Sequence, residues 1–235
     1  MILQKEKTAF GLSGNQLKLI ALFAMTCDHV AVVFFPSISF LRIIGRLAFP
    51  IFAYMIAEGC LYTKNRGKYL LSMAALALVC QLVYFFFMGS LYQCVLVTFS
   101  LSIGLIYLFD LARKKQRVWL WLIAVLAYIG VFFLCEILPG LLPGTDFYID
   151  YGIWGVSLPL LVFFSRYKLL VMAVDLVLLG NALGGVQWYA LAAIAPLALY
   201  DGKRGKYRMK YLFYIYYPAH LALIQLVHML LQAKP

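Results

Sequence analysis

The stretch that decides the fold is TCDHVAVVFFPSISFLRIIGRLAFPIFAYMIAEG, residues 26–59. It consists of two apolar runs separated by the short turn-like segment 36–39. An ionisable side chain at membrane depth costs about 2.5–3.5 kcal/mol or more. Ionisable groups inside these runs must therefore be paired, face water or serve a function, and a hairpin would let them meet. There are five of them: Asp28, His29, Arg42, Arg46 and Glu58.

The composition is that of a membrane protein. The chain has 235 residues, of which 65% are hydrophobic and 12% charged, whereas soluble domains carry about 25% charged residues. We therefore predict an all-α, polytopic bundle in the plasma or inner membrane. No polar linker divides the chain, so we expect one domain over residues 1–235. Residues 1–15 lack the apolar core of a signal peptide, and the first apolar run is expected to remain as a span.

The five cysteines are scattered singly through apolar runs, at positions 27, 60, 80, 94 and 135. They follow neither a metal-binding spacing nor a disulfide framework. We expect buried free thiols and no metal site.

The apolar runs predict about nine transmembrane helices. Their expected ranges are 16–35, 40–63, 67–88, 94–112, 117–137, 151–165, 167–181, 187–200 and 210–231. The sixth and seventh are short for a bilayer, so we expect them to be little tilted, broken or partly re-entrant.

The basic residues predict the orientation of these helices. Segments 1–18, 64–68, 113–117, 166–168 and 203–210 hold 17 of the 20 Lys and Arg residues, and with nine alternating spans all five lie on one side. The positive-inside rule then places the N-terminus in the cytoplasm. This distribution also explains the net charge of +11, so we expect no nucleic-acid partner. Arg42 and Arg46 are exceptions, because they lie at the outer end of the second helix.

Helical geometry brings several of the ionisable groups to one depth. Asp28 and His29 lie about 16 Å into the first helix, and Arg46 lies about 9 Å below the outer end of the second. We predict that Asp28 pairs with Arg46 and that His29 faces a cavity. Pro50 should kink the second helix, with Tyr54 and Glu58 sharing a face below the kink.

Two further segments supply polar groups at related positions. His220 lies about 14 Å into the last helix, with Tyr217 beside it. The outer connection 138–150 contains two Pro-Gly pairs, which indicate a turn-rich loop. This loop should bring Asp146 and Asp150 near Arg42 and Arg46. From the residues alone, His220 is equally compatible with a packed histidine, and the Asp28–Arg46 pair with a purely structural role.

Four sequence blocks resemble the TraX family, named for a conjugal-transfer protein that acetylates pilin. They are LKLIALFAMTCDHVAVVFFP (17–36), LRIIGRLAFPIFAYMIAEG (41–59), YGIWGVSLPLL (151–161) and the pair YALAAIAPLALYDGKRGK and FYIYYPAHL within 189–221. The resemblance implies a multi-span acyltransferase, related to integral-membrane acyltransferases that use acetyl-CoA. The residues it marks as functional are Asp28, His29, Arg42, Arg46, Glu58, Asp150 and His220.

The resemblance and the residue chemistry together suggest roles. Lys203 and Arg204 would bind the acetyl-CoA phosphates, and the pantetheine arm would run along Tyr54 and Glu58. His29 would act as general base or as nucleophile. Arg42 or Arg46 would stabilise the oxyanion or bind an acidic acceptor. Asp28 would position Arg46. Tyr217 would contact the substrate beside His220.

The acceptor could be a protein N-terminus, a glycan or a small molecule, each with an amine or a hydroxyl. Two other classes of function fit the same polar cluster. The first is a small-molecule transporter or flippase, in which these groups bind a substrate or relay protons. The second is a non-catalytic membrane partner of a secretion or conjugation assembly.

Overall fold

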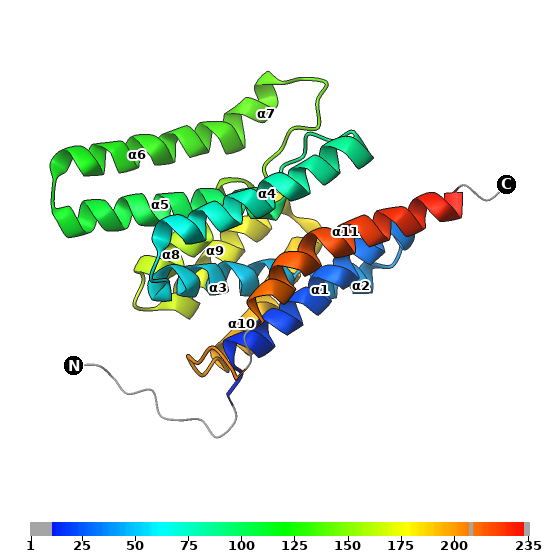
Figure 1. The fold of residues 1–235 in the computed structure, drawn as a ribbon, viewed down its shortest axis with the longest axis horizontal. Coiled ribbons are helices and arrows are strands. Elements are labelled where there is room, and N and C mark those ends of the chain that lie inside the picture. The colour runs from blue at the N-terminus through cyan, green and yellow to red at the C-terminus, as the bar shows by residue number, and fades with distance from the viewer. Residues whose placement is uncertain (1–10, 207–208, 233–235) are drawn as a thin grey trace.

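The computed structural model describes residues 11–206 and 209–232, and all regular elements of this part are helical (Figure 1). Five segments are long and apolar enough to cross a membrane: 14–34, 39–62, 66–86, 95–115 and 118–141. The described part of the chain is therefore all-helical and has the features of a multi-pass membrane protein. The number of nine transmembrane helices remains a prediction. The helices are α1 (Gly14–Phe34), α2 (Ser39–Gly45), α3 (Ala48–Tyr62), α4 (Arg66–Met88), α5 (Val95–Lys115), α6 (Val118–Phe132), η1 (Phe133–Ile137), α7 (Leu138–Leu141), α8 (Gly152–Phe164), α9 (Lys168–Leu183), η2 (Gly185–Ala193), α10 (Ile194–Ala198) and α11 (Lys210–Gln232).

The second predicted helix is bent one turn earlier than expected. It consists of α2 and α3, and the break falls at Arg46 and Leu47. Pro50 still explains the break, because a proline ring clashes with the carbonyl of the residue four positions before it, which here is Arg46. The break places Arg46 at the end of a short helix, where its side chain can reach both α1 and η2.

Two other helices differ from the prediction. The segment predicted as one helix over 187–200 is a 3₁₀ helix, η2, followed by the short α10. Pro196 near the start of α10 removes a backbone donor and crowds the preceding turn, which favours a change of helix type there. The fifth helix continues beyond position 137, through the π-helical turn η1 into α7.

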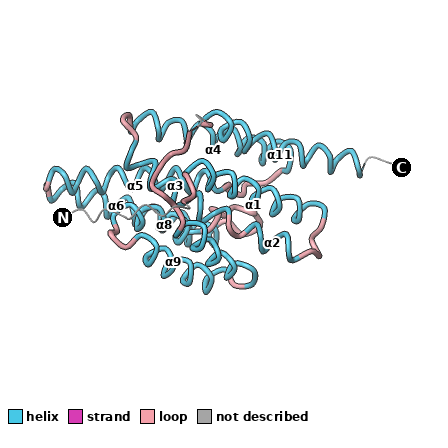
Figure 2. Tube along the Cα trace, turned by 90° about the horizontal axis from the view of Figure 1, so that it is seen from below, coloured by secondary structure: helices cyan, strands magenta, loops and turns pink. Residues whose placement is uncertain are grey.

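Helix α1 is the central element for the site. It packs against α2, α3 and α11, and Figure 2 shows α4 and α11 on one side of the bundle and α9 on the other. The contact with α2 is very close, since a Cβ atom on Gly45 would lie 2.4 Å from the Cβ of Asp28. A glycine at position 45 is therefore required for α2 to approach the polar part of α1.

One end of the bundle, which we call the basic end, gathers the N-terminus of α1 and the connections after α3, α5 and α10 (Figure 1). Ser13 caps α1, because its hydroxyl oxygen accepts a hydrogen bond from the backbone amide of Gln16. The backbone amides of Gly14 and Asn15 donate to the carbonyls of Lys203 and Arg204 at 2.7 and 2.9 Å. Of the basic residues used to predict orientation, Lys5, Lys7 and Arg208 lie outside the described residues.

The orientation can be tested by cysteine labelling. A cysteine at Gly67, in the first turn of α4, should be labelled from the cytoplasm, and one at Gly140, in α7, from the opposite side. An added Cβ has open space at Gly140, whereas Gly144 has a φ of +88° that favours glycine. The parent protein treated with the same impermeant reagent is the control for its five native cysteines. Labelling of both positions from one side would contradict the predicted topology.

Candidate functional site

Two cavities meet inside the bundle. The smaller, about 340 Å³, is lined by Asp28, His29, Arg42, Arg46 and Asp150 among others. The larger, about 690 Å³, extends to the basic end of the bundle. Three side chains line both cavities, one each from α3, α5 and α11: Phe52, Val95 and Tyr217. A molecule entering from the basic end would therefore meet the polar cluster at this shared wall.

Asp28 binds two arginines. Arg46 donates from Nη2 to Oδ2 of Asp28, which confirms the predicted pair. Arg42 Nε lies 3.1 Å from the other carboxylate oxygen, as an ion pair without hydrogen-bond geometry. Arg46 also donates from Nη1 to Oε1 of the buried Gln187 on η2 at 3.2 Å. Arg46 is thus fixed between α1 and η2, while Arg42 is held by one electrostatic contact.

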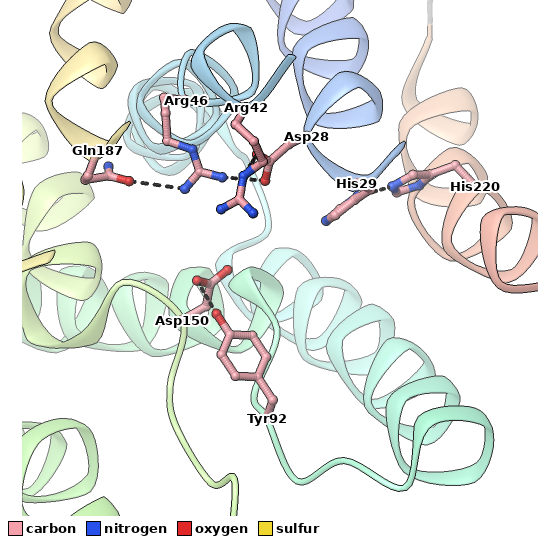
Figure 3. A network of polar contacts seen from close by, with 8 residues as sticks. All are labelled: Asp28, His29, Arg42, Arg46, Tyr92, Asp150, Gln187 and His220. Carbon is pink, nitrogen blue, oxygen red and sulfur yellow. Dashed lines mark hydrogen bonds and ion pairs between the residues drawn. The ribbon is translucent and has the colours of Figure 1, made fainter. Parts of the chain in front are cut away.

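His29 is oriented by His220, as Figure 3 shows. Nδ1 of His29 lies 2.8 Å from Nε2 of His220, and Nδ1 of His220 lies 2.9 Å from the backbone oxygen of Tyr216. A carbonyl oxygen only accepts hydrogen bonds, so His220 donates from Nδ1 and, when neutral, accepts at Nε2. His29 must then donate from Nδ1. Its Nε2 consequently carries the lone pair, and in Figure 3 the ring projects into the space between the arginines and Asp150.

Asp150 forms the wall opposite the arginines (Figure 3). Its Oδ1 accepts a hydrogen bond of 2.6 Å from the hydroxyl of Tyr92. Burial raises the pKa of the Asp150 carboxyl to about 6, although the Tyr92 hydrogen bond and Arg46 act in the opposite direction. The neighbouring Tyr151 has a left-handed backbone, with φ of 63°, and its ring stacks on Phe49 with centroids 3.8 Å apart. The loop between α7 and α8 thereby holds Asp150 at the cavity.

The other predicted acidic residue of this loop lies away from the cavity. Asp146 accepts hydrogen bonds from the Ser90 hydroxyl and from the Leu91 amide at 2.8 Å. Asp146 joins the loop between α7 and α8 to the α4–α5 connection, and it is not among the cavity-lining residues. The expectation that Asp146 and Asp150 both approach the arginines therefore holds for Asp150 alone.

The larger cavity combines basic and aromatic side chains around an apolar interior. Its basic residues come from three parts of the chain: Lys18, Lys64, Lys68 and Arg204. Its aromatic residues include Tyr62, Tyr69 and Tyr200 near this end and Phe99 deeper inside. Glu58 also lines this cavity and is neutralised by an ion pair with Lys168. The cavity is suited to an anionic group at the basic end followed by an extended, weakly polar chain.

Two of the residues predicted to bind the donor are not part of either cavity wall. Tyr54 is buried and packs edge-on against Tyr200, with centroids 5.9 Å apart. Lys203 is exposed, whereas its neighbour Arg204 lines the larger cavity. Tyr217 lines both cavities, and its ring lies edge-on to His220 at 5.4 Å. Tyr54, Lys203, Arg204 and Tyr217 thus occupy four different environments: the packed core, the exposed surface, the larger cavity and the lining that the two cavities share.

Sequence reasoning missed three members of the cluster: Tyr92, Gln187 and Tyr216. Gln187 carries a detectable signal, because an amide at the start of an apolar run needs a partner when it is buried. Tyr216 contributes its backbone carbonyl, which side-chain chemistry does not indicate, and a ring that stacks on His220 with centroids 5.3 Å apart. Within residues 11–206 and 209–232, no three His, Cys, Asp or Glu side chains come together as metal ligands.

Comparison of the whole chain with known proteins identifies its relatives. A probable fimbrial assembly protein FimC, serogroup H1, from Dichelobacter nodosus is 27% identical over 94% of this chain and 97% of its own length. An uncharacterized protein of Rickettsia prowazekii (strain Madrid E) is 39% identical over 23% of this chain and 21% of its own length. No solved structure matches the chain. The family described as TraX protein matches residues 13–228, nearly the whole chain, and the chain therefore belongs to the TraX family.

Proposed function

We propose that this protein is an integral-membrane acetyltransferase that moves an acetyl group from cytosolic acetyl-CoA to an amine or hydroxyl acceptor. The observation that carries the proposal is the junction of the two cavities at Phe52, Val95 and Tyr217. The larger cavity offers basic groups for phosphates and an apolar path for the pantetheine arm. The smaller cavity offers His29 as a base beside the fixed positive charge of Arg46. The thioester would lie at the junction.

The cluster supplies the groups that the reaction requires. Nε2 of His29 takes the proton of the acceptor as its nitrogen or oxygen attacks the thioester carbon. The new bond to the acetyl carbon forms, the carbon–sulfur bond breaks, and the thiolate takes up a proton to leave as free CoA. Nε2 of His220 stabilises the imidazolium of His29 by accepting from Nδ1. The Nε–H of Arg46 is buried without a hydrogen bond to the described residues, and we assign it to the developing oxyanion.

We place this activity in the assembly of surface filaments. The support is the similarity to the probable fimbrial assembly protein of Dichelobacter nodosus, which extends over nearly the full length of both chains. Under this proposal the acceptor is a component of such an assembly, or a group attached to one.

Release of free thiol from acetyl-CoA by the purified protein tests the proposal directly. We expect thiol release that depends on added acceptor, and acetylated product in equal amount. If acceptor candidates cross a vesicle membrane containing the protein while no thioester is cleaved, the transporter interpretation replaces the enzyme.

Variants at the basic end test the donor cavity. Replacing Lys68 and Arg204 together with Ala should weaken acetyl-CoA binding by about tenfold or more, because each charged hydrogen bond to a phosphate contributes about 1.5–3 kcal/mol. The maximal rate should change less, since the reacting groups are untouched. Lys203→Ala is the matched control, because this neighbour of Arg204 does not line the cavity. Binding is measured as the rise in melting temperature with acetyl-CoA. Equal weakening by Lys203→Ala would argue against a defined phosphate site.

A further inference from the structure

The two arginines of the smaller cavity are not equivalent. Arg46 donates to Asp28 and Gln187, and its side chain is 11% exposed. Arg42 makes one ion pair, and its side chain is 34% exposed. No hydrogen bond from the terminal nitrogens of Arg42 to another described residue is found, and Figure 3 shows them directed into the open space of the cavity. Arg42 is therefore available to a ligand.

The position of Arg42 separates it from the thioester. Phe52, at the junction of the cavities, lies six residues beyond Arg46 and ten beyond Arg42. Phe52 lies on α3, which begins directly after the break at Arg46 and Leu47, whereas Arg42 lies on α2 before the break. We therefore place a thioester at the junction nearer to Arg46 than to Arg42. The free guanidinium of Arg42 faces the part of the cavity that remains for the acceptor.

The opposite wall has the complementary charge. Asp150 accepts the Tyr92 hydroxyl at Oδ1, its carboxylate also interacts with the backbone amide of Tyr151, and no ion pair of this carboxylate within 4 Å is found among the described residues. His29 lies to one side of Arg42 and Asp150, and its ring points toward the open space that these two residues face (Figure 3). A ligand spanning the cavity would meet a guanidinium at one end and a carboxylate at the other, with the lone pair of His29 between them.

We infer that the smaller cavity binds an acceptor that carries both an amine and an acidic group, with the acid on Arg42 and the amine between Asp150 and His29. The inference rests on the proposed function, because it takes this cavity as the acceptor site. A guanidinium binds a carboxylate or phosphate through its fork of N–H groups. Asp150 attracts the ammonium form of the acceptor, which first gives up one proton to water, and His29 takes a second proton as the neutral amine attacks the thioester carbon. Such an acceptor is either a small molecule with both groups, such as a free amino acid or an aminoalkyl phosphate, or a peptide N-terminus with an acidic side chain.

Thermal stabilisation by matched ligands, without acetyl-CoA, tests the inference. The free acids are glycine, β-alanine, 4-aminobutanoate and 2-aminoethyl phosphate, each compared with its neutral amide or, for the phosphate, with ethanolamine. The peptide arm compares Glu-Gly amide with Gln-Gly amide. We expect at least one acidic amine to raise the melting temperature with saturable dependence, and its neutral counterpart to bind about tenfold to 100-fold more weakly. Acids or amines alone at the same concentration should have little effect.

Variants of Arg42 and Asp150 test which residue binds the acidic group of the ligand and which binds its amine. Arg42→Gln should abolish the preference for the acid over its neutral counterpart, Arg42→Lys should retain part of it, and Asp150→Asn should weaken binding of the amine. Arg113→Gln is the control, because Arg113 pairs with Asp110 at the basic end. Equal stabilisation by acids and neutral counterparts in the unmodified protein, or no stabilisation by any acid, would overturn the inference. Thiol release from acetyl-CoA is measured separately, so the enzyme proposal can stand when this inference fails.

Discussion

Replacing His29 with Ala should lower acetyl transfer by about 10²–10⁴-fold, the usual contribution of a general base. The hydrogen bond of His220 to the Tyr216 carbonyl fixes the tautomer of both rings, so His29 presents its lone pair to the cavity. The variant loses this base, while the donor cavity keeps its lining. Acetyl-CoA should therefore still raise the melting temperature of His29→Ala by nearly the amount seen in the unmodified protein.

Two further histidine variants make this test specific. His228→Ala is the matched control, because His228 lies on α11 against Phe34 and does not line the cavity. It should keep unmodified turnover. His220→Gln should lower turnover less than His29→Ala and alter its pH profile, because His220 acts by orienting His29. If His29→Ala retains full turnover while His220→Gln loses it, the base has been assigned to the wrong ring.

The sequence was sufficient for the features that depend on local geometry. Helix positions follow from apolar runs bounded by caps and turns, so each of the nine predicted ranges coincides with helical segments, although 40–63 is divided into α2 and α3 and 187–200 into η2 and α10. The Asp28–Arg46 pair follows from the helical rise and the short turn at 36–39, because both residues lie in one hairpin. The break in the second helix follows from Pro50, whose ring clashes with the carbonyl of Arg46 four residues earlier.

Features that depend on long-range packing could not be predicted in the same way. His29 and His220 are 191 residues apart, and matching depth alone does not place two helices side by side. The packing of α11 against α1 decides that contact. The sharing of Asp28 between two arginines has a similar origin, because it requires the close approach at Gly45. The roles of Gln187 and Tyr92 depend on which loop ends meet the cluster.

The second large effect concerns stability, and it follows from that sharing. Asp28→Asn leaves the guanidiniums of Arg42 and Arg46 without their carboxylate. Breaking a buried pair by removing one partner costs about 3–5 kcal/mol, so we expect a loss of that size in the free energy of unfolding. Arg46→Gln should cost less, because Asp28 keeps its ion pair with Arg42. Asp28→Asn is thus predicted to lower the free energy of unfolding more than Arg46→Gln does.

The double variant, Asp28→Asn with Arg46→Gln, distinguishes a coupled cluster from independent contacts. It should be more stable than the sum of the two single effects predicts, because the charge stranded by Asp28→Asn is partly removed. Full recovery is not expected, since Arg42 remains unpaired, and adding Arg42→Gln should recover more. Unfolding in mixed detergent micelles measures the four combinations and the triple variant. Arg113→Gln is the control, because Asp110 retains Arg66 and Lys114 when Arg113 is lost. Additive effects of Asp28→Asn and Arg46→Gln would mean that this contact does not hold α1 to α2, and the position of His29 beside Arg42 would then need another cause.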